Sequence, residues 1–339
     1  MQSLIDLGER QILDTIIPRF VAGAGDDCAT IDLPGAVLVA TTDPVPPPAA
    51  ASIGKDEDPF WLGWLLVTIN VSDLAAAGAR PLAFLAALEC EATRSVSEFE
   101  RIFEGIKAGC EDAKISYVGG NIREATRLTA VGVALGICRQ YAPLRRTGAS
   151  DGDIILSVGQ GGVFWRDALR MLDGAGEVHK ETSPLYKPRS QIGVMHQLAA
   201  KGLLTAAMDN SDGLLPTLSE LAKKNKLGVE IDVQYLLVPG VAEGERVDQA
   251  RMWLGWGDWN VIASVREANL AQVLQLGREV GVALVPIGRF SNHFHGVVLC
   301  NGEHSIAAPR LESERFARDS WMLKGIDEYV RMLRAVELP

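Results

Sequence analysis

Hydrophobic and polar residues change their spacing several times along this chain, and each change predicts a different secondary structure element. Short apolar runs rich in β-branched residues are typical of strands, whereas apolar positions three or four residues apart are typical of amphipathic helices. Strands are therefore predicted at 36–42, 129–137 and 154–158. Helices are predicted from the first residues to about Phe20 and at 96–113, 164–172, 191–201 and 214–225.

A pair of adjacent glycines lies in the first half of the chain. Residues 116–118 are predicted to lead into a turn at Gly119, Gly120 and Asn121, because paired glycines usually mark turns. Strands and helices alternate on both sides of this turn. The pattern predicts an α+β fold in which mixed sheets are covered by helices.

A polar, turn-rich segment at 145–153 precedes a fresh strand, and we place a domain boundary there. We predict an N-terminal domain at 1–144. A C-terminal domain is predicted at 145–310, and a helical extension at 311–339.

Composition narrows the possible functions. The chain has 339 residues, of which 47% are hydrophobic, enough for about two domains. Its formal net charge of -10 argues against a nucleic-acid partner, because phosphate backbones attract basic surfaces. The five cysteines form no CxxC pair, so neither a zinc site nor a disulfide framework is indicated, and a reducing cytoplasm fits best.

The apolar stretch at 60–79 is the candidate for a membrane span. Asn70, Ser72 and Asp73 lie inside it, and a spanning helix would place them in hydrocarbon at high cost. We therefore expect a buried helix and no membrane partner.

Short acidic motifs recur along the chain with almost no catalytic base among them. Carboxylates gathered in one cleft repel each other unless divalent cations neutralise them, and hard oxygen ligands suit magnesium. Such a cleft can hold a polyphosphate through bridging metal ions. The motifs are Gly25-Asp26-Asp27, Thr41-Thr42-Asp43, Asn70-Val71-Ser72-Asp73 and Asp209-Asn210-Ser211-Asp212-Gly213.

Together with Gly119-Gly120-Asn121 and Arg146-Thr147-Gly148-Ala149, these motifs follow the order found in thiamine-monophosphate kinases. The chain resembles a divergent member of that family, within the aminoimidazole ribonucleotide synthetase superfamily. The resemblance implies two α+β domains with ATP and several Mg²⁺ ions between them. It also implies that the N-terminal domain, 1–144, binds ATP and Mg²⁺ and pairs in a homodimer.

The resemblance also assigns roles to residues by position. Asp43, Asp73 and Asp212 are implied to be catalytic, and Gly120, Asn121, Arg146 and Ser211 to contact the nucleotide. The implied metal ligands are Asp27, Thr41, Thr42, Asp43, Asp73, Asp209 and Asp212.

Departures from the family pattern cluster on the acceptor side. Pro44 to Ala51 occupies the region where the family usually has a histidine, and Gly255 to Asn260 replaces a Gly-Gly-Glu-Asp-Tyr-Glu segment. Trp256, Asp258 and Trp259 in that segment are therefore candidates for binding the acceptor. Asn121 stands where the family has a metal-binding aspartate, which predicts weaker metal binding there.

Several features have a second, purely structural reading. Asp27, Asp73 and Asp212 could be helix or turn caps. Residues 159–162, before a predicted helix, could bind phosphate or form a simple strand-to-helix turn. Residues 44–58 could be a mobile flap or a disordered loop, and the tryptophans at 253, 256 and 259 could line a pocket or form a helical core stripe.

Three functions follow from this reading. The first is an ATP- and Mg²⁺-dependent kinase in the cytoplasm, acting on a small and possibly phosphorylated acceptor other than thiamine monophosphate. The second is an ATP-dependent cyclo-ligase or dehydration-type enzyme of the same superfamily. The third is a non-catalytic nucleotide-binding paralogue.

Overall fold

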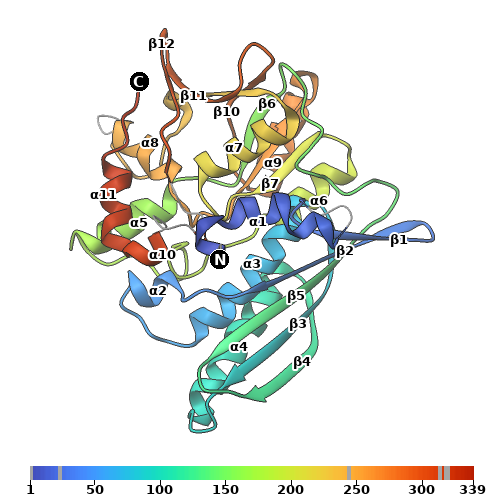
Figure 1. Cartoon of the computed structure of the whole chain (residues 1–339), viewed down its shortest axis with the longest axis vertical. Helices are drawn as coiled ribbons and strands as arrows, with labels where there is room; N and C mark the ends of the chain where they lie inside the picture. Colours follow the sequence, from blue (N-terminus) through green and yellow to red (C-terminus); the bar gives the residue numbers. More distant parts are fainter. Residues whose placement is uncertain (1–2, 22–24, 243–245, 312–314, 317–320) are drawn as a thin grey trace.

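Two β-sheets flanked by helices make up the molecule, one in each half of the chain (Figure 1). The computed structural model describes residues 3–21, 25–242, 246–311, 315–316 and 321–339. The predicted α+β class is confirmed.

The N-terminal sheet has five strands in the order β1-β2-β5-β3-β4, with β3 and β4 parallel and the other pairs antiparallel. Strand β5 is central and pairs with β2 on one side and with β3 on the other. The strands are β1 (Ala29–Leu33), β2 (Ala36–Pro44), β3 (Arg80–Cys90), β4 (Ser116–Glu124) and β5 (Thr129–Cys138).

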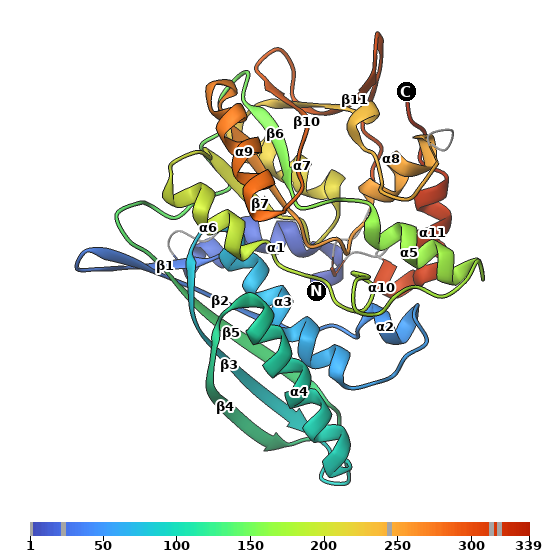
Figure 2. The ribbon, with the colours of Figure 1, turned by 180° about the vertical axis from the view of Figure 1, so that it is seen from behind.

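Helices α3 (Phe60–Ala76) and α4 (Val96–Ala113) cover one face of this sheet (Figure 2). They approach closely because glycines face each other: a Cβ at Gly63 would meet the Ile102 carbonyl oxygen at 2.0 Å, and one at Gly105 would meet the Phe60 carbonyl oxygen at 2.1 Å. Helix α3 also contacts the second domain, so almost all of its residues are buried. Among the described residues, no helix is both long and apolar enough to cross a membrane.

The C-terminal sheet has seven strands in the order β12-β11-β8-β10-β6-β9-β7, and β8 and β11 are its parallel pair. Strands β6 and β9 are buried along their full length, and β6 has the bounds predicted for it. The strands are β6 (Ile154–Val158), β7 (Ala206–Asp209), β8 (Gly228–Asp232), β9 (Val261–Val265), β10 (Leu284–Ser291), β11 (Gly296–Asn301) and β12 (His304–Ala307).

Helices surround the second sheet, and α11 near the C-terminus packs against α8. The tyrosine of α11, Tyr329, stacks on Trp165 of α5 with ring centroids 5.3 Å apart. The helices are α5 (Val163–Leu172), α6 (Ile192–Ala200), α7 (Leu214–Asn225), α8 (Arg246–Leu254), α9 (Leu270–Val280), α10 (Trp321–Lys324) and α11 (Ile326–Arg334).

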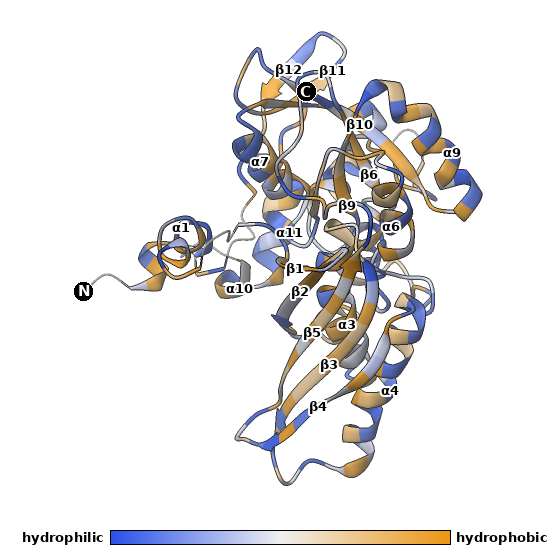
Figure 3. Cartoon of the chain, turned by 90° about the vertical axis from the view of Figure 1, so that its right-hand side faces the viewer, coloured by the Kyte–Doolittle hydropathy of each residue, from blue (hydrophilic) through white to orange (hydrophobic). Residues whose placement is uncertain are grey.

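The predicted opening helix is shorter than expected. Helix α1 (Glu9–Thr15) lies between two 3-10 turns, η1 (Leu4–Asp6) and η2 (Ile17–Arg19), and has no buried residue. Figure 3 shows α1 projecting to one side of the two sheets. The apolar side chains of α1 therefore do not pack in either hydrophobic core.

The predicted turn at Gly119, Gly120 and Asn121 is wrong, because all three residues lie inside β4. The glycines mark a β-bulge, where the register with β3 shifts between Phe84 and Leu85. Gly120 has φ +158, and a Cβ there would meet the Ala86 carbonyl oxygen at 1.7 Å. Glycine serves here to let two strands approach, which the sequence pattern of a turn does not reveal.

Candidate active site

Three aspartates from distant parts of the chain converge between the two domains. Asp27 precedes β1, Asp73 is on α3, and Asp209 is the last residue of β7. Each offers a carboxylate oxygen within 4.8 Å of the other two. Ser72 Oγ donates a hydrogen bond to Asp209 Oδ2 at 3.4 Å. The motif at 70–73 in the first domain therefore lies beside the motif at 209–213 in the second.

Ionising these carboxylates together is unfavourable without a cation. Burial, followed by the charges of Asp209, Asp43 and Asp27, holds the pKa of Asp73 well above its usual range. Burial raises the pKa of Asp209 to about 8, and the charge of Asp27 adds to this. Burial also raises the pKa of Asp27, although Arg146 opposes the rise. An oxygen-liganded divalent cation relieves both effects, so the three carboxylates fit Mg²⁺ and would hold it.

A polar cavity of about 320 Å³ surrounds the three aspartates. Arg146 donates from Nε and Nη2 to Asp27 Oδ1, at 3.1 and 2.5 Å. The backbone N–H of Arg146 donates to Asp26 Oδ1 at 3.0 Å, which fixes the arginine beside the carboxylates. Other predicted ligands line the same cavity, namely Thr41, Thr42, Asp43, Ser211 and Asp212.

Strand β2 presents three of these residues, and each is held differently. Thr41 Oγ1 donates to Asp73 Oδ2 at 2.5 Å. Thr42 Oγ1 donates to the Gly132 carbonyl oxygen at 2.9 Å, so its hydroxyl proton is used within the sheet. The backbone N–H of Asp43 donates to Asn70 Oδ1 at 2.9 Å, which ties β2 to α3 next to Asp73.

Gly120 and Asn121 do not line this cavity in the described part of the chain. Asp43 of β2 lies opposite Gly132, Gly132 opposite Ala86, and Ala86 opposite Gly120. Three strand spacings separate Gly120 from Asp43, a distance of about 14 Å. A direct role for both residues in nucleotide binding stays a prediction.

A second, mainly apolar cavity of about 110 Å³ adjoins the first. Ser211 and Asp212 line both cavities. Trp256 and Trp259 line the apolar one, whereas Trp253 is a buried residue of α8, so the tryptophan series divides between pocket and core. The other lining side chains include Pro46, Pro47, Pro48, Ala49, Trp61, Phe164, Leu185 and Tyr186.

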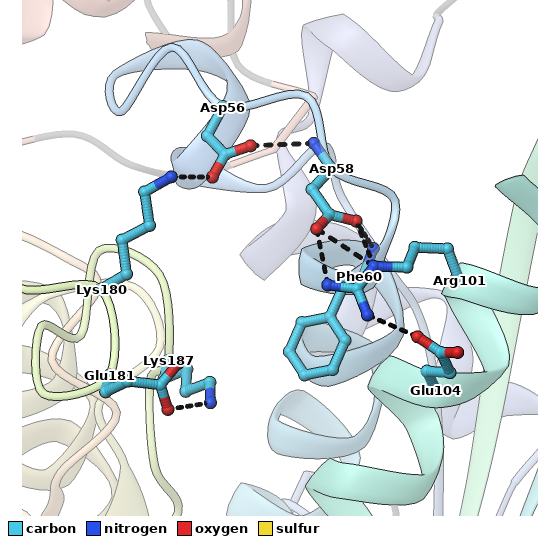
Figure 4. Close-up of polar contacts among 8 residues, drawn as sticks. All are labelled: Asp56, Asp58, Phe60, Arg101, Glu104, Lys180, Glu181 and Lys187. Atoms are coloured by element: carbon cyan, nitrogen blue, oxygen red, sulfur yellow. Dashed lines mark hydrogen bonds and ion pairs between the residues drawn. The ribbon is translucent and has the colours of Figure 1, made fainter.

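Two loops, residues 44–58 and 173–191, form one wall of this apolar cavity. Tyr186 Oη donates to the Gly54 carbonyl oxygen at 3.0 Å, and Lys180 Nζ donates to Asp56 Oδ2 at 2.6 Å. Figure 4 shows this ion pair beside the contact of Arg101 with both carboxylate oxygens of Asp58. Residues 44–58 also contain α2 (Ala49–Ser52) and buried side chains, which contradicts their reading as a disordered loop.

Asp258 lies apart from the lining of both cavities. Its carboxylate accepts hydrogen bonds from the backbone N–H groups of Gly162 and Phe164, at 2.6 and 2.8 Å. These groups open α5, so the carboxylate caps that helix from a distant loop. Residues 159–162 therefore form a strand-to-helix turn, and the buried N–H group of Gly162 already has a protein acceptor.

Several residues that line the polar cavity were not identified from the sequence motifs. They come from α1, from α7 and from the C-terminal segment, where no acidic motif or glycine run marks them. They are Glu9, Arg10, Asp14, Glu220, Lys224 and Arg315.

Comparison with known proteins gives the family. The family model for the N-terminal domain of AIR synthase related proteins matches residues 25–138, and that for the C-terminal domain matches residues 150–301. A thiamine-monophosphate kinase from Methanospirillum hungatei is 31% identical over 279 residues, which cover 80% of this chain and 92% of that protein. The chain belongs to the thiamine-monophosphate kinase family.

Solved structures agree with this membership at the level of the fold. A structure described as AaThiL complexed with AMPPCP and TMP has a TM-score of 0.73 at 23% identity and covers 90% of this chain and 97% of that one. A thiamine-monophosphate kinase from Stenotrophomonas maltophilia has a TM-score of 0.69 at 23% identity, with 88% and 96% covered.

Membership in this kinase family makes the chain an ATP-dependent phosphotransferase, as the motifs predict. The predicted two-domain architecture is confirmed with it. The individual roles given to the site residues, and the boundaries at 144 and 310, stay predictions.

Proposed function

We propose that this protein transfers the γ-phosphoryl group of ATP, with Mg²⁺, to the phosphate group of a small acceptor that has a flat, largely apolar body. We further propose that this acceptor differs from thiamine monophosphate, after which the relatives are named. In this proposal the polar cavity takes the triphosphate and the apolar cavity takes the acceptor.

One observation carries the proposal about the acceptor. The two segments that depart from the family pattern, 44–51 and 255–260, are distant in sequence, yet both line the apolar cavity. This cavity meets the polar one at Ser211 and Asp212, where the reacting phosphates would face each other. Departures that gather around one cavity, while most of the implied metal-ligand positions are retained, favour a changed acceptor.

The reaction needs no side-chain nucleophile. An oxygen of the acceptor's phosphate dianion supplies the electron pair for the new bond to the γ-phosphorus. The bond from that phosphorus to the β,γ-bridging oxygen breaks, and its electron pair leaves with ADP, so no proton has to move. The products are ADP and a diphosphorylated acceptor.

Each group of residues has a part in this scheme. Mg²⁺, when bound, neutralises the phosphate oxygens and the charge that develops on them. Asp43, Asp73 and Asp212 would hold Mg²⁺ through their carboxylates, since without a cation these carboxylates would repel the phosphates. Arg146 and Ser211 would contact the nucleotide, with Arg146 oriented by Asp27.

A homodimer is part of the proposal. Strand β4 is at the edge of its sheet, and Val118 and Ile122 on it are 59% and 60% exposed. An edge strand with unpaired backbone groups and exposed apolar side chains favours association with another chain. A second copy of this chain would cover it.

The deciding experiment is a screen for ADP release by the purified protein with ATP and Mg²⁺. The panel contains phosphorylated heteroaromatic cofactor precursors, among them thiamine monophosphate, each beside its unphosphorylated form. We expect ADP and a diphosphorylated product with one phosphorylated acceptor, and much slower turnover of thiamine monophosphate.

Other outcomes point to the other functions. Thiamine monophosphate as the fastest acceptor contradicts the proposed change of acceptor. Free phosphate with a ring-closed or dehydrated product indicates the cyclo-ligase or dehydration chemistry. Nucleotide binding without turnover of any compound indicates a non-catalytic paralogue.

A further inference from the structure

Arg315 lies at the junction of the two cavities. It lines both the polar cavity with the aspartates and the apolar cavity with the tryptophans. It shares this position with Ser211 and Asp212, one a neutral and one an acidic residue. The junction is where a phosphate attached to a group in the apolar cavity would meet the γ-phosphate of ATP.

The apolar cavity offers few ways to neutralise a phosphate. Among its described lining residues, Arg315 is the one cation, and Asp212 beside it would repel a phosphate. The positive charge of Arg315 also acts on Asp43 and opposes the rise that burial causes in the pKa of that carboxyl. Arg315 and Asp43 both line the polar cavity, so the arginine lies on the side where the phosphates would react.

Other cations of the polar cavity already have protein partners. Arg146 is bound to Asp27, and Lys224 lies 3.6 Å from Glu220. In the part of the chain that the structure describes, no carboxylate forms an ion pair with the Arg315 guanidinium. Arg315 therefore has its charge available for a ligand.

The backbone of Arg315 is fixed by α1. The N–H of Arg315 donates to Glu9 Oε2 at 3.3 Å, and the N–H of Glu9 donates to the Arg315 carbonyl oxygen at 3.0 Å. This pair of contacts explains why α1 lies over the polar cavity although it has no buried residue. It gives the solvent-exposed N-terminal helix a role in positioning an arginine.

We infer that Arg315 binds the phosphate group of the acceptor and so makes the enzyme select phosphorylated acceptors. The inference rests on the proposed function for its reaction, but its binding step can be tested without turnover. The guanidinium suits this task because its planar N–H groups can bind two phosphate oxygens at once.

The test measures binding by the fluorescence of the pocket tryptophans, with Mg²⁺ and a nonhydrolysable ATP analogue present. The probes are two matched pairs, thiamine monophosphate with thiamine and pyridoxine 5′-phosphate with pyridoxine. Wild-type protein is compared with Arg315→Ala, Arg315→Lys and Arg289→Ala. Arg289 is an exposed arginine on β10 that pairs with Glu267 and lines neither cavity, so it is the control.

We expect wild type to bind at least one phosphorylated probe more tightly than its unphosphorylated partner. Arg315→Ala should weaken binding of that phosphorylated probe by about 10-fold or more, the size of a lost charge-assisted hydrogen bond. Binding of the unphosphorylated partner and of the ATP analogue should change by less than about twofold. Arg315→Lys should recover part of the loss, and Arg289→Ala should match wild type.

Glu9→Ala provides a second route to the same answer, because it removes the acceptor of the Arg315 backbone N–H. It should selectively weaken binding of the phosphorylated probe, and the loss should be smaller than that caused by Arg315→Ala. The inference is overturned if wild type does not discriminate within either pair, or if Arg315→Ala weakens both members of a pair equally. Preserved discrimination in a protein that never releases ADP would overturn the proposed function alone.

Discussion

Asp73 is the carboxylate with the most to gain from a bound cation. It is buried on α3 among Asp27, Asp43 and Asp209, and both burial and these charges raise its pKa. Removing its charge relieves repulsion in the metal-free protein but takes away a ligand for Mg²⁺. Stability and activity should therefore respond in opposite directions.

We predict that Asp73→Asn lowers kcat/KM for ADP release by about 100-fold or more, the scale of a lost electrostatic contact to a transition state. The same variant should have an equal or higher melting temperature without Mg²⁺, and it should lose most of the shift that Mg²⁺ causes in wild type. Thermal unfolding with and without Mg²⁺ measures this. Asp32→Asn, an exposed change on β1, is the control, and a lower melting temperature of metal-free Asp73→Asn would contradict the argument.

Asp258 makes stability depend on pH. Burial raises its pKa to about 7, although the N–H groups of Phe164 and Gly162 favour the carboxylate. Between its ordinary value of 3.8 and about 7, the unfolded chain is ionised while the folded chain keeps the proton. The unfolded state then binds fewer protons, so the free energy of unfolding falls as pH rises through this range.

We predict that wild type loses stability relative to Asp258→Asn as pH rises from about 4 to about 7, because asparagine does not titrate. Urea unfolding of both proteins at several pH values gives the difference in free energy. If asparagine caps α5 less well than aspartate, the free energy of unfolding of Asp258→Asn is lower by the same amount at every pH. This shifts its curve against pH without changing the slope. Parallel curves for the two proteins would show that Asp258 does not titrate in this range.

At the scale of elements, the wall of the apolar cavity depends on contacts between loops of different domains. Tyr186 donates to the Gly54 carbonyl oxygen, and Trp64 Nε1 donates to the Pro188 carbonyl oxygen at 2.7 Å. Lys187 Nζ lies over the rings of Phe60 and Trp64, 5.4 and 5.1 Å from their centroids. These contacts attach this wall of the apolar cavity to α3, the helix that also carries Asp73.

We predict that Tyr186→Phe destabilises the fold by about 1 kcal/mol, because one buried hydrogen bond is lost while the ring remains. It should raise the KM for the acceptor more than the KM for ATP, since the wall borders only the acceptor cavity. Steady-state kinetics with each substrate varied in turn measures the split. Tyr235→Phe is the matched control on an exposed tyrosine, and an equal rise in both KM values would argue against a separate acceptor wall.

At the scale of the whole molecule, the proposed second copy would cover the outer edge of β4, which pairs with β3 on its inner side and with no other strand among the described residues. We predict a dimer in analytical ultracentrifugation and a shift toward monomer for Ile122→Asp, because a buried, unpaired charge would oppose association. Val280→Asp on α9, an exposed apolar position in the other domain, should leave the mass unchanged. A monomeric wild type would remove the dimer from the proposal.

Sequence patterns were sufficient wherever one physical signal dominates. Helices α4 and α7 have the predicted bounds because their apolar spacing is regular, and β6 is the predicted buried run. The acidic motifs also predicted their own convergence, since so many carboxylates without bases favour a shared cation. Membership in the kinase family follows from the same motifs.

The tertiary structure decided what a local pattern leaves open. It showed that Gly119 and Gly120 belong to a bulged strand and not to a turn, because both pair with β3 and the Ala86 carbonyl oxygen occupies the space of a side chain at Gly120. It assigned Asp258 to a helix end and brought Arg315 to the junction of two cavities, because both depend on contacts between residues far apart in the chain. Sequence determined the elements and the chemistry available; packing between distant segments determined which side chains share a site.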